Sequence, residues 1–323
     1  MLKSSIERKP HRAVGLIVSA VLLTIGADVT FSQSCCGIGS SRSAGLHTTA
    51  SKGHAFVGTS VVHSASGELY KGGKVIDDPT GRSSRRTDFL ADVGYGVSDR
   101  FFMRLSTGFS NRSKEWSIYI DAVPPISENF TQDNWGLLDG SLSASFTLIP
   151  STVISKKQLT LGAEVTLPWG SIDHVQDGVT LSRDLQAGSE MWALGGFIFF
   201  HRDWPDRKLA VSLMSRGVIP IANKQKNATG KTLELSATAL AGPFRWLRVS
   251  LGPALKLSGA DLANGVSNDR TGGTRIDIVS GLEISPSRNW AFTFDAELPA
   301  FHQFRGTQLS TAYVFKGGVG VWL

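Results

Sequence analysis

The chain has 323 residues, of which 41% are hydrophobic and 19% are charged, and its mean hydropathy is −0.01. These values exclude a disordered chain, which would combine low hydrophobicity with high net charge. They also exclude a helical membrane protein, because no apolar run beyond the N-terminal segment approaches the roughly 18 residues of a membrane-spanning helix. The formal net charge is +6, and no basic run is interleaved with aromatic residues, so we expect no nucleic-acid partner.

The N-terminal segment has the features of a secretory signal peptide. It begins with a basic region formed by Lys3, Arg8, Lys9 and Arg12. An apolar stretch at 13–25 follows, which is too short to span a membrane comfortably. Small residues precede the next cysteine, so we predict cleavage after Ser34 and removal of residues 1–34.

Cys35 and Cys36 begin the predicted mature chain. Three interpretations stay open for them: lipid attachment to Cys35, binding of a soft metal together with His47 or His54, and no role. Neighbouring cysteines cannot easily form a disulfide with each other without strain. We favour two incidental thiols without a metal, in an N-terminal extension or plug at 35–53.

Beyond residue 53, apolar residues alternate with polar or small ones at a period of two, which predicts β-strands. Phe292 and Phe294, for example, alternate with Thr293 and Asp295. Clear alternation covers 88–97, 101–110, 138–148, 158–167, 232–239, 247–257, 275–284, 290–298 and 312–323. It is less regular at 54–65, 190–202 and 208–221. The stretch 197–200 is apolar on both faces, which indicates a wall that packs against a plug.

The connections between these segments alternate in length. Short ones lie at 98–99, 150–156, 203–207, 243–245 and 285–288. Long ones lie near 66–86, 111–133, 169–188, 222–231, 259–273 and 299–311. Short turns at one end and long loops at the other are typical of outer-membrane barrels. We therefore predict an all-β fold, a transmembrane antiparallel β-barrel of about 12 strands at 54–323. A large soluble β-sandwich or solenoid is the alternative.

The last strand resembles the C-terminal signal that the barrel-assembly machinery reads, which has apolar residues at every second position and ends on an aromatic residue. The corresponding positions here hold Tyr313, Phe315, Val319, Val321 and Leu323. Leu323 replaces the usual terminal Phe. The resemblance implies that the assembly machinery is a partner of this strand.

The mature chain is also similar to the twelve-stranded, transporter-like barrels grouped with meta-pathway phenol-degradation outer-membrane proteins. The basis is the barrel size, the rhythm of the loops and the strand opening Asn134-Trp135-Gly136-Leu137-Leu138-Asp139. The resemblance implies a channel or transporter in the outer membrane of a Gram-negative bacterium. It also implies that small solutes, hydrophobic or aromatic ones among them, pass through the lumen.

Charged residues on the inward faces of the predicted strands are the candidate lumen residues. They are Asp92, Arg104, Asp139, Glu164, Arg248, Arg275, Asp277, Glu283, Asp295 and Glu297. Either they form a solvated wall with cross-strand ion pairs, or they form a charged constriction that selects solutes. We expect membrane lipid and a small solute as partners, and the residues imply no cofactor.

An enzyme is the alternative from another class, because a Ser–His arrangement on a barrel wall could hydrolyse lipid acyl esters. His201 or His302 with a nearby Ser would be the candidates. The chain has no G-x-S-x-G elbow and no H-E-x-x-H motif, so we predict that it is not an enzyme. A structural or adhesive barrel is a third class, for which the loops are short.

Overall fold

The computed structural model describes residues 52–120, 126–152, 156–176, 178–181, 185–224, 226–287 and 289–323. The predicted signal peptide and nearly all of the predicted extension, including Cys35 and Cys36, lie outside the described residues. Within the described ranges, no helix is long and apolar enough to cross a membrane.

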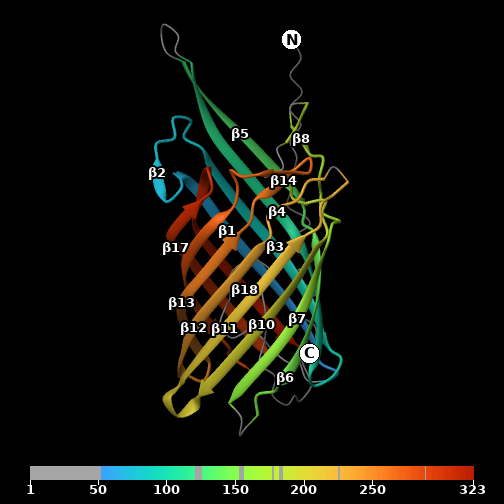
Figure 1. Cartoon of the computed structure of the whole chain (residues 1–323). Coiled ribbons are helices and arrows are strands. Elements are labelled where there is room, and N and C mark those ends of the chain that lie inside the picture. The colour runs from blue at the N-terminus through green and yellow to red at the C-terminus, as the bar shows by residue number, and fades with distance from the viewer. Residues whose placement is uncertain are drawn as a thin grey trace, which may run out of the picture. The chain divides into compact units, whose positions relative to one another are not determined.

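One antiparallel sheet closes on itself into a barrel, because its last strand pairs with its first (Figure 1). The wall strands are β1 (Ala55–Lys71), β3 (Ser83–Gly96), β4 (Phe101–Ile120), β5 (Ile126–Leu137), β6 (Gly140–Ile149), β7 (Lys157–Leu167), β10 (Ala193–Trp204), β11 (Leu209–Pro220), β12 (Thr232–Phe244), β13 (Leu247–Ser258), β16 (Gly273–Ile284), β17 (Trp290–Phe304) and β18 (Thr307–Trp322). The sheet has 14 strands, of which β2 (Lys74–Ile76) is a short addition. β5 and β6 both pair with β4 and are two parts of one wall strand. The barrel therefore has twelve wall strands. The predicted all-β transmembrane barrel is confirmed.

The two faces of the wall follow the alternation in the sequence. Phe292 and Phe294 on β17 are 36% and 53% exposed, whereas Thr293 and Asp295 are 5% and 4% exposed. Neighbouring side chains of a strand point to opposite faces. The apolar side chains therefore form the outer, lipid-facing surface, and the polar ones form the inner wall. Closure gives the backbone the hydrogen-bond partners that lipid does not offer.

The two ends of the barrel differ. At the short-turn end, the 3-10 helix η1 (Pro205–Arg207) joins β10 to β11, and Lys208 takes a left-handed φ of 51°. At the long-loop end, the β7–β10 connection carries β8 (Val175–Gln176) and β9 (Val179–Thr180), and the β13–β16 connection carries β14 (Asp261–Ala263) and β15 (Val266–Asn268). In outer-membrane barrels generally, short turns are periplasmic and long loops are extracellular.

Three of the predicted long loops are mostly strand, so the predicted connections at 66–86, 111–133 and 299–311 were too long. β1 continues to Lys71, β4 continues to Ile120, and β17 and β18 meet at a turn of only Arg305 and Gly306. Above the lipid both faces of a strand can be polar, so the alternation ends while the strand pairing continues. The loss of alternation marks the end of the lipid contact and not the end of the strand.

The stretch from Asn134 to Asp139 spans the break between β5 and β6 within one wall strand and does not open a strand, which corrects the prediction. Both β5 and β6 pair with β4, and the break between them falls at Leu138 and Asp139. Leu138 is 8% exposed, so it does not belong to the lipid-facing surface. Its backbone N–H donates to Gly108 O at 2.8 Å, and the Asp139 carboxylate binds a loop.

The stretch that is apolar on both faces lies on β10. Phe197 points inward over Gly162 of β7, where a Cβ atom would come within 2.1 Å of the Phe197 ring. Phe199 also points inward and is 3% exposed. Gly162 therefore makes room for an aromatic ring on the inner wall. That this wall packs against a plug stays a prediction.

Candidate functional site

The most densely charged part of the inner wall crosses four neighbouring strands. Lys256 Nζ on β13 lies 3.0 Å from Asp277 Oδ2 on β16 and 3.9 Å from Glu234 Oε1 on β12, and it pairs with Glu297 on β17. Arg275 Nε lies 2.9 Å from Asp277 Oδ1. The side chains of Asp277 and Glu297 are only 1% exposed. We name these five residues the inner charge cluster; its three carboxylates face two cations.

Further ion pairs occupy the rest of the inner wall. Arg104 Nη2 on β4 lies 2.6 Å from Asp92 Oδ1 on β3, and both side chains are buried. Arg248 Nη1 on β13 lies 3.7 Å from Glu283 Oε1 on β16. Asp295 on β17 is buried opposite a lysine of β18. The wall therefore carries both signs of charge in close pairs.

Glu164 forms an ion pair that reaches across a strand. Its Oε1 lies 2.5 Å from Arg216 Nη2 on β11, although β10 runs between their strands. Gly195 on β10 leaves the space, since a Cβ atom there would lie 2.5 Å from Glu164 Cγ. Arg216 was not among the predicted residues, because the alternation at 208–221 is irregular and no sequence signal connects it to Glu164.

Nine of the ten predicted lumen residues lie on wall strands. The structure brings Arg275, Asp277 and Glu297 together in the inner charge cluster and places the other six in separate pairs. Asp139 differs, because it lies in the break between β5 and β6. Its carboxylate accepts hydrogen bonds from backbone N–H groups of the β7–β10 connection.

The described residues 185–187 of that connection lie inside the wall, against β4 and β5. Leu185 and Ala187 are 1% and 4% exposed. Ala187 packs on the inner face of β5 at Gly136, where an added Cβ atom would lie 2.7 Å from Ala187 Cβ. The Arg112 guanidinium on β4 donates to the carbonyl oxygens of Gln186 and, at 3.2 Å, Ala187. We name residues 185–191 the inner loop.

Two more side chains hold the inner loop against the wall. Asn134 Nδ2 donates to Leu185 O at 2.7 Å. Asp139 Oδ1 accepts from Gly170 N at 2.9 Å, and Asp139 Oδ2 accepts from Ser189 N at 2.8 Å. Because the inner loop lies inside the wall, it reduces the free cross-section of the lumen at the long-loop end. The sequence pattern gave no sign of this arrangement.

Aromatic side chains form a group at each end of the inner wall. At the short-turn end, the Trp322 ring centroid lies 4.8 Å from that of Phe56 and 6.2 Å from that of Phe102, and all three side chains are buried. At the long-loop end, the His302 ring centroid lies 4.7 Å from that of Tyr70 and 5.3 Å from that of Phe304. Apolar residues on the inner wall are exceptions to the alternation, so the period-two pattern predicts neither group.

Each histidine of the hydrolase alternative has a serine neighbour on the adjacent strand. Ser212 Oγ lies 2.9 Å from His201 Nδ1, and Ser310 Oγ lies 3.2 Å from both ring nitrogens of His302. A hydroxyl oxygen at the same distance from both ring nitrogens is out of line with either lone pair, which is poor geometry for a general base. Ser212 and Ser310 both face the inner wall, away from the acyl chains of the bilayer.

The described residues contain no group of three or more His, Cys, Asp or Glu that could hold a metal ion. His54, one of the two histidines considered as a metal ligand, lies with Nδ1 3.2 Å from Leu323 O. Cys35, Cys36 and His47 lie outside the described residues, so the interpretations of the two cysteines stay predictions.

The comparisons with known proteins agree with this fold. An outer-membrane channel from Pseudomonas putida F1 overlays with a TM-score of 0.62 at 12% identity, covering 84% of this chain and 96% of that one. The toluene transporter TodX of P. putida (TM-score 0.43, 10% identity, 84% and 90% covered) and the translocator domain of the autotransporter NalP from Neisseria meningitidis (0.42, 10%, 84% and 89%) overlay less closely. The chain has an outer-membrane β-barrel fold. The predicted resemblance to transporter-like barrels of this class is confirmed for the fold. No family model matches the chain, and no curated protein matches it.

Proposed function

We propose that this protein is an outer-membrane channel or transporter that passes small hydrophobic or aromatic solutes through its lumen and is not an enzyme. The inner wall carries the proposal. Its charges lie close to partners of opposite sign, which leaves a weak net field for ions, and aromatic groups stand at both of its ends. Aromatic faces offer a large contact area to an apolar solute. The channel from P. putida F1, which shares the fold, supports the same role and location.

The proposal includes the path to the membrane. We propose that residues 1–34 are removed on export, that residues 35–53 form an extension or plug, and that the assembly machinery reads the last strand. On that strand Phe315 is 50% exposed and faces lipid, whereas Trp322 faces inward onto Phe56. Because Trp322 faces inward, it falls between Val321 and Leu323, which hold apolar positions of the signal pattern.

Conductance of the purified protein in a planar bilayer tests the proposal, after a shift in gel mobility on boiling has shown that the barrel is folded. We expect channel steps that an added phenol blocks, because the solute would occupy the aromatic groups. Phe102→Ala and Phe304→Ala should each weaken the block at least threefold. Phe109→Ala is the matched control, since Phe109 is 56% exposed on the lipid face.

A folded barrel that neither conducts nor accelerates the uptake of an aromatic solute would overturn the proposal. Release of fatty acid from phospholipid vesicles would then support the hydrolase alternative. An equal effect of all three Phe→Ala variants would show that the inner aromatic groups do not contact the solute.

A further inference from the structure

Two cations lie directly opposite each other on the outer face of the barrel, at its short-turn end. Arg202 on β10 pairs with Lys157 on β7, and this is the last pair of that ladder. His201 and Gln158 form the pair before it, and Gln158 is 8% exposed on the inner wall. Because side chains alternate between the two faces of a strand, Lys157 and Arg202 face outward, and both are exposed. We name these two residues the outer cation pair.

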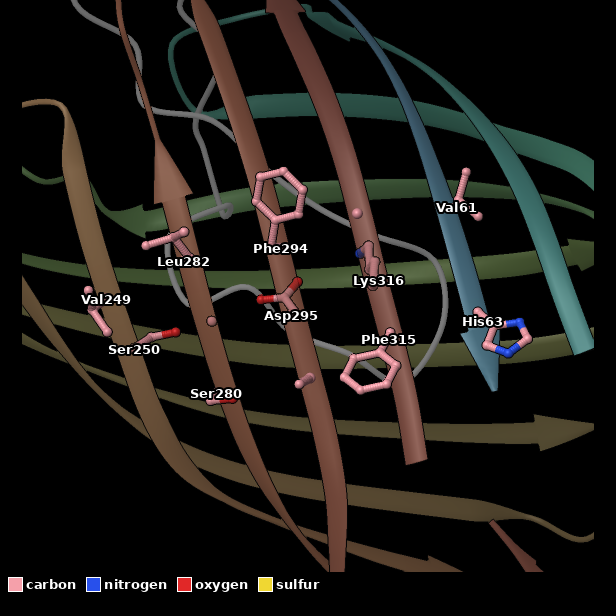
Figure 2. A pocket seen from close by; sticks show the side chains of 13 residues that line it. Val61, His63, Val249, Ser250, Ser280, Leu282, Phe294, Asp295, Phe315 and Lys316 are labelled. Carbon is pink, nitrogen blue, oxygen red and sulfur yellow. The ribbon is translucent and has the colours of Figure 1, made fainter. Parts of the chain in front are cut away.

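The outer cation pair departs from the usual distribution of charge over the wall. Figure 2 shows Val61, Phe294 and Phe315 around a groove of about 510 Å³ on the lipid-facing surface. Asp295 follows Phe294 on β17 and Lys316 follows Phe315 on β18, and these charged residues are only 4% and 5% exposed. Lipid therefore meets apolar side chains there, and the charges face the inner wall. On β7 and β10 the last pair of the ladder places charge outside.

The outer cation pair lies where the apolar surface ends. Ile149 on β6 is 43% exposed and pairs with Leu159, and Leu209 on β11 is 46% exposed and pairs with Trp204. Leu159 and Trp204 are each two residues away from a member of the outer cation pair. A basic residue on the lipid-facing surface costs little free energy only near the membrane interface. The pair is therefore at the level of the lipid headgroups.

An aromatic ring holds one member of the outer cation pair. Arg202 Cζ lies 4.7 Å from the centroid of the Trp204 ring. A guanidinium over the face of a tryptophan is attracted to the ring electrostatically, and tryptophan is enriched at membrane interfaces. The stacking fixes the Arg202 guanidinium on the outer face and leaves the N–H groups at its edge able to donate.

The outer cation pair has no acidic counterpart among the described residues. Arg104 and Lys256 on the inner wall lie 2.6 and 3.0 Å from carboxylate oxygens. No carboxylate in the described part of the chain forms an ion pair with Lys157 or Arg202. Like charges directly opposite each other on neighbouring strands destabilise the strand pair. An anion held between the two side chains would remove this repulsion.

We propose that the outer cation pair binds the phosphate group of an anionic phospholipid of the phosphatidylglycerol type. The Arg202 guanidinium offers its N–H donors in a planar fork that suits phosphate oxygens, and the Lys157 ammonium adds a second charge from the neighbouring strand. A zwitterionic headgroup would bring an ammonium as a third cation, so the pair selects a lipid whose phosphate is its only charge. Basic sites on membrane proteins bind anionic lipid headgroups in this way.

The surface next to the pair suits the rest of such a lipid. Phe200 and Ile198 follow Arg202 on the outer face of β10, and Ile198 is 53% exposed. Acyl chains of the bound lipid would lie along these side chains. Because short turns are periplasmic in outer-membrane barrels, the lipid would belong to the periplasmic leaflet. This site is separate from the lumen and does not depend on the proposed function.

Native mass spectrometry of the full-length protein in dodecyl maltoside tests the site, because it counts the lipid molecules bound to the folded barrel. The probes are dioleoylphosphatidylglycerol, dioleoylphosphatidylcholine with the same acyl chains, and inorganic phosphate. The test variant is Lys157→Gln with Arg202→Gln. The matched control is Arg207→Gln with Arg245→Gln, which removes the same charge from exposed turn residues at the same end of the barrel. A shift in gel mobility on boiling shows that each variant is folded.

We expect the wild type and the control to bind one phosphatidylglycerol at least fivefold more tightly than one phosphatidylcholine, and the test variant to prefer it less than twofold. Equal preference in the wild type and the test variant would overturn the proposal. An equal loss in the control would also overturn it, since the total positive charge of the turns would then suffice. Displacement of the lipid by an equal concentration of inorganic phosphate would show a site for free anions and would overturn the assignment to lipid.

Resistance to urea in the same detergent gives a second readout. Without anionic lipid, Lys157→Gln should raise the urea concentration at which the folded band disappears from gels, because it removes the repulsion from Arg202. Added phosphatidylglycerol should raise this midpoint more in the wild type than in Lys157→Gln. A wild-type midpoint that phosphatidylglycerol leaves unchanged would contradict the proposal, as would a Lys157→Gln midpoint in lipid-free detergent no higher than that of the wild type.

Discussion

Lys256 on β13 and Asp277 on β16 form a 3.0 Å ion pair on the inner wall, where the Asp277 side chain is 1% exposed. The pair is part of the inner charge cluster, which spans four strands and in which two cations hold three carboxylates. Backbone hydrogen bonds join only neighbouring strands of the sheet. These side-chain ion pairs also join strands that are not neighbours, such as β13 and β17.

Replacement of Lys256 by Met should destabilise the barrel by about 3–5 kcal/mol, because it leaves buried carboxylates without their main cation. The urea concentration at which the fast-migrating folded band disappears from gels measures the change. Lys256→Arg is the control and should retain most of the stability. A midpoint for Lys256→Met equal to that of the wild type would show that water already solvates these carboxylates.

Leu213→Arg should lower the yield of folded barrel more than Met214→Arg does, although the two residues are neighbours on β11. Leu213 is 45% exposed on the lipid face, and Met214 lies on the inner face between Ser212 and Arg216. Arginine on the lipid face near the bilayer centre costs about 2–4 kcal/mol, whereas the inner wall accepts charge. Yield of heat-shifted barrel in the membrane fraction is the measurement. Equal yields would contradict the assignment of faces.

Asp139→Ala should release the inner loop, because the carboxylate accepts hydrogen bonds from Gly170 N and Ser189 N. We expect faster protease cleavage within 185–191 and larger single-channel conductance at unchanged gel mobility. Asp133→Ala is the matched control, since Asp133 is exposed on the same wall strand. Conductance that rises equally in both variants would show that the inner loop does not narrow the lumen.

The backbone amides of the turn at Asp78 should lose their protection from hydrogen exchange in acid. Burial raises the pKa of this carboxyl, but hydrogen bonds from Arg82 and Thr80 outweigh burial and hold the pKa well below its usual range. A lowered folded-state pKa stabilises the turn above the unfolded-state value of about 4, and this contribution is lost as the pH falls from there toward the folded-state value.

Hydrogen exchange at the Thr80 and Arg82 amides, both of which donate to Asp78, measures this effect. Protection factors corrected for intrinsic rates should be constant above about pH 5 and should fall as the pH approaches 3. Asp78→Asn should show low protection at every pH. Protection in the wild type that does not change with pH would contradict the charge-based account of this turn.

The sequence determined the strands and the orientation of their faces, because lipid outside and polar groups inside impose a period of two on each strand of the wall. Phe294 and Asp295 were assigned to opposite faces on this basis, and their exposed fractions of 53% and 4% agree. Where lipid contact ends, the period disappears, so the upper parts of β4 and β17 were interpreted as loops.

Only the tertiary structure decided which groups meet across strands. Glu164 and Arg216 are on strands separated by another strand, and the inner loop binds Arg112, which lies far earlier in the chain. Period-two alternation carries no information on register between distant segments. These contacts depend on the closure of the sheet, because closure fixes how far each strand is shifted along the barrel relative to the others.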